Sequence, residues 1–480
     1  MFTRITFFNE TAYDYHDGGY VPLEVYDAPR VPLTIPSLLK PDRETDTDVW
    51  LTVHAQPGET QILPGAKTKT WGYNQSLLGQ TIVFRSGKTY HVTLKNSLPE
   101  LTTFHWHGLD VPGPFIDGGC HAPIYPGEEK EITFTVNQPA ATTWLHAHPC
   151  PLTGWDVWHG LAAMVYVEDD HEDSLALPHD YGVDDLPIVL QDRRFHEDNQ
   201  WDYDADYDPD GTAGPTALIN GTVNPSFDVT TPKLRLRFLD GSNRREWRLH
   251  LSDDLIMTQI ASDGGLLPEP VQMTKCMLTC AERAEFIIDF SDYKAGDQVT
   301  LYPDVDPNAL VHQVVLAGTD EEITINGLKF GMMRIDDRQE IGKTEYWDIT
   351  NTNDCCGGMI HPYHMHGGSF QIVSRNGESP YPNELGYKDT VAVNPGETVR
   401  IKMKFNFAGV FMYHCHIIEH EDGGMMAQMQ VYTPEEPEKK YDLMAMDTLM
   451  NALAEERGCT VEDLQIKSLD SYKKMGMDMC

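Results

Sequence analysis

The sequence predicts an all-β protein built from several β-sandwiches. Short segments that alternate apolar and polar residues recur along the chain, with turn residues between them. The clearest is residues 233–239, where a period of two is typical of a strand with one buried face. A chain of 480 residues is also too long for one ordinary core, which indicates about two to four domains. Comparable alternations occupy residues 81–85, 90–95, 131–136, 285–290, 345–350 and 398–405.

Two breaks in this pattern divide the chain. Residues 168–185 and roughly 304–322 are rich in acidic or loop-forming residues and lack periodicity. Regular short strands between such breaks predict Greek-key sandwiches of a common domain size. Near the end, apolar residues at helical spacing between 443 and 453 predict a short helix that Gly458 could end, and Thr460 with Asp463 could cap a second. The expected units are an N-terminal arm (1–45), three sandwiches (46–170, 171–315 and 316–434) and a helical or disordered tail (435–480).

The composition argues against several kinds of partner and location. Lysine and arginine number 36 against 74 aspartates and glutamates, a formal net charge of -38, which disfavours nucleic acid or an anionic membrane as a partner. The first residues lack the basic and apolar regions of a signal peptide, and no apolar run is long enough to span a bilayer. We expect a monomer in the cytoplasm, with export by another route left open. Nine cysteines, an odd number, do not suggest a disulfide framework.

Half of the 20 histidines fall in four short stretches. In a strand, residues i and i+2 point to the same side about 6.5–7 Å apart, so each His-x-His pair can present two imidazoles to one site. Eight such imidazoles suit a cluster of metal ions rather than a single ion. The stretches hold His105 and His107; His146 and His148; His361, His364 and His366; and His414, His416 and His420.

The last stretch places a cysteine between its first two histidines. These histidines face one way and the cysteine the other, so one strand can serve two metal sites. Cys415 with His361, His420 and a weak axial thioether from Met425 would form the ligand set of a blue-copper site. Structural zinc also uses histidine and cysteine, but this number of ligands exceeds what tetrahedral zinc can use. Copper is therefore the predicted metal.

At these residues the sequence resembles the multicopper oxidase family, which includes laccases and bacterial cuprous oxidases. The resemblance runs from about Pro32 to Val431 and is greatest to the bacterial three-domain branch. It also covers Thr70–Asn74, Ser262–Pro268 and Glu419–Met426. The resemblance implies three cupredoxin domains, with a type 1 copper in the third and a trinuclear cluster between the first and third. The implied cofactors are thus four copper ions, one type 1, one type 2 and two type 3, and the implied reaction reduces dioxygen to water.

The resemblance also implies a role for each candidate ligand. The middle sandwich carries no such motif, so we interpret its isolated histidines as structural. The matching residues are His361, Cys415, His420 and Met425 for type 1 copper; His105 and His364 for type 2; and His107, His146, His148, His366, His414 and His416 for the type 3 pair.

Two acidic residues match the family's proton-supply positions. Reduction of dioxygen consumes protons, which must reach a buried cluster through groups able to relay them. Asp117, in Phe-Ile-Asp-Gly-Gly, resembles the acidic residue near the type 2 copper, and Glu421 resembles the glutamate on the oxygen side. We therefore expect Asp117→Asn or Glu421→Gln to lower turnover while copper content and blue absorption stay.

The electron donor is the part of the function with two interpretations. A weak thioether at Met425 implies a type 1 potential in the lower to middle part of the family range, within reach of phenols, aromatic amines, Cu(I) and Fe(II). Cuprous oxidases usually carry a methionine-rich insertion over the type 1 copper, whereas residues 327–343 are few and hold only Met332 and Met333. We expect an open type 1 edge and a laccase-type oxidation of small aromatic donors. The alternative is a cuprous or ferrous metallo-oxidase, because Met359 precedes His361 by two residues.

Other sulfur-containing residues allow more than one interpretation. Cys355 and Cys356 could bind a soft metal or be buried loop thiols, and residues 475–480 could load copper or be a disordered end. Cys276 and Cys280 are interpreted as core residues. A cupredoxin that only transfers electrons or stores copper needs no eight-histidine cluster. A copper nitrite reductase lacks the contiguous His-Cys-His followed by His and Met.

Overall fold

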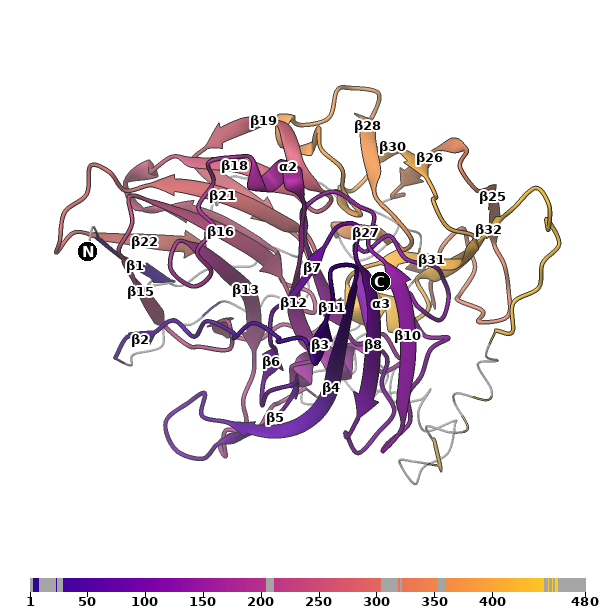
Figure 1. Cartoon of the computed structure of the whole chain (residues 1–480), viewed down its shortest axis with the longest axis horizontal. Helices are drawn as coiled ribbons and strands as arrows, with labels where there is room; N and C mark the ends of the chain where they lie inside the picture. The colour runs from indigo at the N-terminus through magenta and orange to yellow at the C-terminus, as the bar shows by residue number, and fades with distance from the viewer. Residues whose placement is uncertain are drawn as a thin grey trace.

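The computed structural model describes residues 3–7, 23, 29–203, 211–303, 318–319, 322–352 and 359–443, with residues 448, 451, 454 and 455 of the tail. Strands dominate, and they form successive groups of sheets along the chain, from indigo through magenta to yellow in Figure 1. The predicted all-β architecture of cupredoxin-like sandwiches is confirmed. Among the described residues, no helix is long and apolar enough to cross a bilayer.

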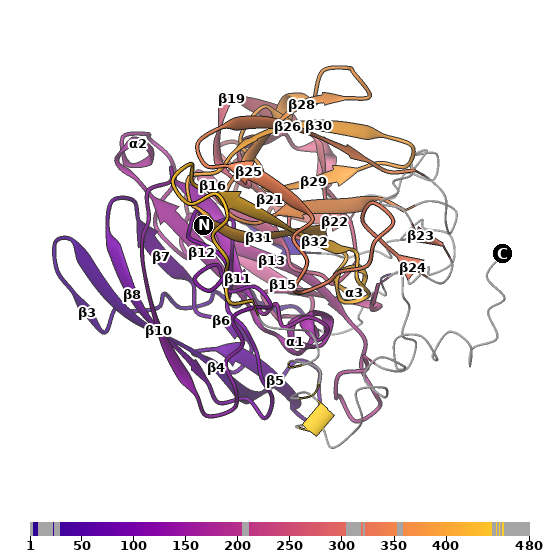
Figure 2. The same ribbon diagram turned by 90° about the vertical axis from the view of Figure 1, so that its right-hand side faces the viewer.

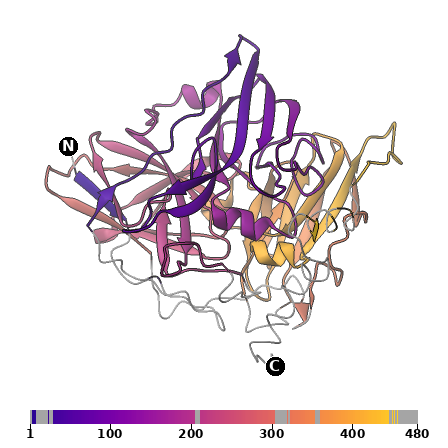
Figure 3. The same ribbon diagram turned by 90° about the horizontal axis from the view of Figure 1, so that it is seen from below.

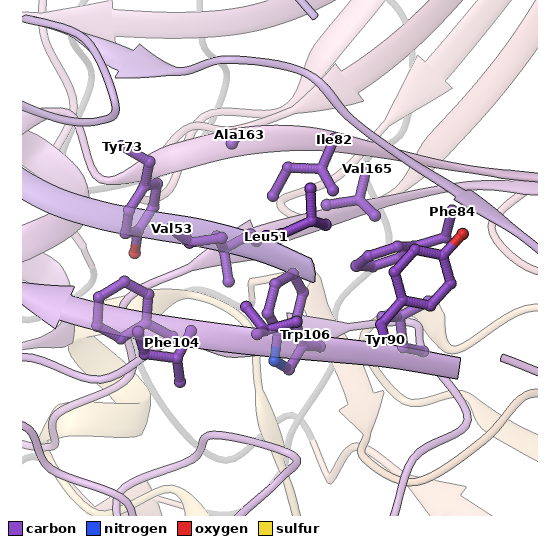
Figure 4. Close-up of a cluster of buried hydrophobic side chains, with 14 of the residues drawn as sticks. Leu51, Val53, Tyr73, Ile82, Phe84, Tyr90, Phe104, Trp106, Ala163 and Val165 are labelled. Atoms are coloured by element: carbon purple, nitrogen blue, oxygen red, sulfur yellow. The ribbon is translucent and has the colours of Figure 1, made fainter. Parts of the chain in front are cut away.

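The first sandwich packs two sheets over an aromatic core. Trp106 is fully buried in this core, with its ring centroid 5.6 Å from that of Phe84, and Figure 4 shows both among the core side chains. One sheet contains β3 (Arg43–Glu44), β4 (Asp48–Thr60), β5 (Thr68–Tyr73), β6 (Leu78–Gly79), β8 (Thr89–Asn96) and β10 (Glu129–Thr135). The other contains β7 (Ile82–Arg85), β9 (His105–His107), β11 (Ala141–His146) and β12 (Ala162–Glu168).

The middle sandwich includes two strands, β1 and β2, from the segment predicted to be an N-terminal arm. β1 pairs antiparallel with β15 and parallel with β22, and its Ile5 and Phe7 are buried in the middle core. One sheet contains β1 (Thr3–Phe7), β2 (Val31–Pro32), β15 (Pro225–Val229), β17 (Trp247–Leu251), β20 (Lys275–Leu278) and β22 (Gln298–Pro303). The other contains β13 (Asp185–Arg193), β14 (Thr216–Ile219), β16 (Lys233–Asp240), β18 (Met257–Ser262), β19 (Gly265–Met273) and β21 (Arg283–Asp289).

The third sandwich follows the short hairpin of β23 (Gly318–Thr319) and β24 (Glu322–Ile323). One sheet contains β25 (Asp337–Glu340), β27 (His361–Met365), β29 (Thr390–Val393), β31 (Gly409–Cys415) and β32 (Met426–Tyr432). The other contains β26 (Thr344–Thr350), β28 (Phe370–Arg375) and β30 (Thr398–Lys404). Figure 2 places these orange and yellow strands above the indigo strands of the first sandwich.

Few helices occur in the described residues. These are α1 (Thr153–His159), α2 (Asp170–Asp173) and α3 (Ile418–Asp422), with short 3₁₀ turns at Ser252–Asp254 and Pro382–Glu384. Helix α1 packs on α3, and Figure 3 shows this contact between the purple first sandwich and the yellow third. The contact brings the His-rich segments of the two sandwiches together. The predicted tail helix lies mostly outside the described residues, although residues 448, 451, 454 and 455 are helical.

Candidate copper centres

The candidate site near Cys415 is built from the end of β31 and the loop that follows it. Cys415 and Tyr413 point into the core of the third sandwich, so His414 points to the opposite side. The Cys415 Sγ lies 3.0 Å from His361 Nδ1 and 3.6 Å from His420 Nδ1, and the two nitrogens are 3.2 Å apart. One sulfur and two nitrogens thus converge on one point, which fits the trigonal His₂Cys set of a blue-copper site.

A tight loop returns His420 and Met425 to this point. The His420 N–H donates to the Ile417 carbonyl at 3.0 Å, and the Met425 N–H donates to the His420 carbonyl at 2.8 Å. Gly424 has φ +109°, a left-handed conformation that favours glycine. Met425 is 1% exposed and belongs to the same buried cluster as Cys415. Local chain geometry therefore brings His420 and Met425 back to Cys415, whereas His361 is supplied by β27.

A second, larger centre lies between the first and third sandwiches. Because Trp106 enters the core, the flanking histidines of β9 face away from it, toward the third sandwich. All eight histidines predicted for the trinuclear cluster are buried. Their ligand atoms form groups that lie within 4.8 Å of one another: His107, His146 and His416; His148, His366 and His414; and His105 and His364 with His107. The predicted set is thus brought together in one place.

Four of these histidines have a buried ring nitrogen without a hydrogen-bond partner, and in two of them the bond of the other nitrogen fixes the tautomer. The Nδ1 atoms of His105 and His364 donate to the carbonyls of Asp117 and Asp389, at 3.0 and 2.9 Å. Their Nε2 atoms are buried and have no hydrogen-bond partner. A fixed Nδ1–H leaves the Nε2 lone pair free, which is the form that binds a metal. Unpartnered buried nitrogens are costly without a ligand, so the donor set fits a bound metal.

Burial keeps the surrounding imidazoles in their metal-binding form. Burial, together with neighbouring imidazoles, holds the pKa values of His107, His146 and His414 well below the usual value. Neutral imidazole is the form that coordinates transition metals. The cluster can therefore accept metal ions without first losing protons from its histidines.

The two predicted acidic residues contact different histidines of the cluster. Asp117 Oδ2 is 2.8 Å from His366 Nδ1 and 3.5 Å from His105 Nδ1. Burial by itself would raise the pKa of Asp117, but the two histidines lower it well below the usual value. Glu421 Oε1 is 3.1 Å from His148 Nε2, and Oε2 is 3.1 Å from His414 Nδ1. Burial raises the pKa of Glu421 well above its usual value, so its proton is held at the cluster.

The hydroxyl of Thr153 and the carboxylate of Asp422 are further polar groups beside Glu421. The Thr153 hydroxyl donates to Glu421 Oε1 at 3.0 Å, and the Thr153 and Gly154 N–H groups donate to Asp422. Burial raises the pKa of Asp422 to about 7. Two adjacent buried carboxyl groups with raised pKa values thus lie at the contact of α1 and α3.

The sequence analysis missed an ion pair that touches one candidate ligand. Asp389 Oδ1 accepts from His107 Nε2 at 3.1 Å, which leaves His107 Nδ1 free to coordinate. Arg283 of β21 donates to both carboxylate oxygens of Asp389, at 2.7 and 2.5 Å. Both side chains are fully buried. The middle sandwich, which carries no copper motif, thus supports a histidine of the cluster through this pair.

The remaining predictions on sulfur have mixed outcomes. Cys276 and Cys280 are buried, as expected for core residues. Met359 is 7% exposed beside the Cys415 centre. At the predicted type 1 edge, His361 is 6% and His420 3% exposed. Cys355, Cys356 and residues 475–480 lie outside the described residues.

The cupredoxin-type sandwiches bring these histidines and a cysteine together in two candidate centres. This arrangement is that of a copper-dependent oxidoreductase. Two family models described as multicopper oxidase match residues 54–172 and 304–435. The multicopper oxidase mco of Staphylococcus aureus is 39% identical over 415 residues, covering 83% of this chain and 92% of that protein. The chain belongs to the multicopper oxidase family, as predicted.

Solved structures give the same result. A laccase from Pediococcus acidilactici is 54% identical with a TM-score of 0.82, covering 90% of this chain and 100% of that one. The multicopper oxidase from Campylobacter jejuni, a metallo-oxidase, is 25% identical with a TM-score of 0.72, covering 87% of this chain and 99% of that one. Both kinds of relative thus share the fold of this chain.

Proposed function

We propose that the protein is a laccase-type multicopper oxidase that holds four copper ions and reduces dioxygen to water with electrons from phenols or aromatic amines. The observation that carries the proposal is that the end of β31 supplies both centres: Cys415 faces one, and His414 and His416 face the other. The type 1 ligands would be His361, Cys415 and His420, with Met425 axial. The type 2 ligands would be His105 and His364, and the type 3 ligands would be the triads His107, His146, His416 and His148, His366, His414.

Copper supplies the one-electron redox chemistry, and the protein supplies the path and the protons. Cys415 faces one centre while His414 and His416, its chain neighbours, face the other. Four donors would each lose one electron, and the backbone from Cys415 to His414 and His416 would be the path between the two centres. One dioxygen with four electrons and four protons gives two waters.

Protons would come from the two carboxyl sides. Glu421 holds a proton within 3.1 Å of two imidazoles, and Asp422 beside it, with a pKa of about 7, can resupply it. Asp117 stays ionised between His366 and His105, where it orients both rings. The two acids therefore have different parts: Glu421 holds a proton that it can donate, whereas the ionised Asp117 orients His366 and His105 and carries a proton toward the cluster only transiently.

We expect Glu421→Gln to lower turnover by about 100-fold, within the range of general acid catalysis, while copper content and blue absorption stay. Glutamine keeps a carbonyl oxygen for the Thr153 hydroxyl but cannot release a proton. Asp117→Asn should lower turnover in the same way. The measurements are oxygen uptake, copper content and visible absorption. If either variant loses copper, the residue has a structural role instead.

The donor class rests on two observations. The Pediococcus acidilactici laccase is the relative with 54% identity, and residues 327–343 hold only two methionines where cuprous oxidases carry more. Cuprous oxidation is the second candidate, because the buried thioether of Met359 lies two residues from His361. A thioether is a ligand that Cu(I) prefers.

Steady-state oxygen uptake with dimethoxyphenol and with Cu(I), in wild type and Met359→Leu, separates the two donors. We expect a larger kcat/KM for the phenol than for Cu(I). For each donor, kcat/KM should be the same in Met359→Leu as in wild type, since leucine conserves the volume of Met359. The opposite result is a larger kcat/KM for Cu(I) that falls at least about tenfold in Met359→Leu. That result would replace the laccase assignment with the metallo-oxidase one.

A further inference from the structure

A sulfur-rich cluster lies where the first sandwich meets the third, apart from the ligands described above. It contains seven buried side chains, of which five carry sulfur. The whole chain has only nine cysteines and 20 methionines among 480 residues, so this share is far above the chain's average. The sulfur residues are Cys120 and Cys150 of the first sandwich and Met332, Met412 and Met426 of the third.

Two of these sulfurs are already at the spacing of ligands to one ion. Cys120 Sγ lies 3.5 Å from Met412 Sδ. With metal–sulfur bonds of about 2.3 Å, two sulfur ligands of one ion lie about 3.5–4 Å apart. The loop approaches this closely only because residue 119 is glycine, where a Cβ would lie 1.9 Å from Met412 Cε. Both Cys120 and Cys150 are free thiols.

A side-chain amide holds the third-sandwich part of the cluster against the Cys120 loop. Gln428 Oε1 lies 2.5 Å from His121 Nε2, and Gln428 Nε2 donates to the Met332 carbonyl at 3.0 Å. Met332 is 1% exposed, whereas the next residue, Met333, is 59% exposed. The chain thus carries one exposed thioether, that of Met333, next to a thioether of the buried cluster.

We propose that Cys120, Met412 and Cys150 form a binding site for one Cu(I) ion, additional to the four coppers of the proposed catalytic centres. Thiols and thioethers select Cu(I), and the ion would replace the thiol proton of Cys120. Met412 and His414 lie on the same face of β31 two residues apart, or about 6.5–7 Å. The site thus holds copper beside the cluster that must be filled. The alternative is that these cysteine and methionine side chains only pack as hydrophobic core residues, in which case they would bind no ion.

The test is the uptake of Ag(I), a redox-inert analogue of Cu(I), by the copper-loaded oxidised enzyme, counted by native mass spectrometry. We expect wild type to bind one more Ag(I) than Cys120→Ala. Met412→Leu conserves volume and should bind that ion at least tenfold more weakly. Retained blue absorption in both variants shows that each is folded and loaded.

The matched control removes sulfur from a different core. Cys276→Ala and Met257→Leu alter buried residues of the middle sandwich and should leave Ag(I) uptake equal to that of wild type. The proposal is wrong if Cys120→Ala or Met412→Leu binds Ag(I) as wild type does. It is also wrong if the control variants lose the same ion, since uptake would then report general sulfur content.

Discussion

Cys415→Ser should abolish the blue absorption and lower turnover with every donor by more than about 100-fold. Loss of a residue that only hydrogen-bonds to a metal ligand already lowers metal affinity or activity by about 10–100-fold, and loss of the ligand itself should cost more. Cys415 Sγ is the sulfur on which the nitrogens of His361 and His420 converge. A serine hydroxyl has nearly the same size but is not a soft ligand. The type 2 signal in electron paramagnetic resonance should persist, because the trinuclear histidines face the other side of β31.

A second buried cysteine provides the control for this substitution. Cys280 is fully buried in the turn between β20 and β21 of the middle sandwich, and its Sγ lies 3.8 Å from the Arg245 carbonyl, which a serine hydroxyl can also approach. Cys280→Ser should keep both the blue absorption and turnover. Blue absorption that survives in Cys415→Ser, or disappears in Cys280→Ser, would contradict the assignment of Cys415 as the type 1 ligand.

The candidate ligands could be predicted because each depends on local chain geometry. Alternation along a strand places Trp106 in the core and His105 and His107 outside it, and this needs no knowledge of the other sandwiches. The same rule separates Cys415 from His414. Fold class followed from the same period of two. Motifs of a few residues therefore defined both the sheets and the centres that the sheets carry.

Contacts between distant segments could not be predicted in this way. The alternation in 233–239 suggested a solvent-exposed polar face, yet Arg235 and Arg237 of β16 are buried and pair with Glu285. Similarly, β1 joins the middle sheet although it precedes the first sandwich in sequence. A charged residue facing a neighbouring sandwich has the same sequence pattern as one facing water, because only its partner differs.

Arg283 is the clearest case of such a hidden partner, and its loss should have a large effect. Arg283→Met should lower the free energy of unfolding by about 3–5 kcal/mol, because it leaves the Asp389 carboxylate buried without its partner. It should also weaken copper binding at the cluster by about 10–100-fold, because Asp389 would no longer hold His107 in position. Thermal unfolding and copper titration of the apoprotein, followed by the type 2 and type 3 signals, measure the two effects separately.

Arg235→Met distinguishes support of a ligand from general stability. Arg235 is equally deep in the middle sandwich and pairs with Glu285 at 2.5 Å, but this pair touches no candidate ligand. Both variants should unfold at lower temperature, whereas only Arg283→Met should lose type 2 and type 3 copper while keeping the blue type 1 centre. Equal copper affinity in the two variants would mean that Arg283 stabilises the domain contact alone. A selective loss would mean that the sandwich without copper ligands fixes the geometry of the cluster.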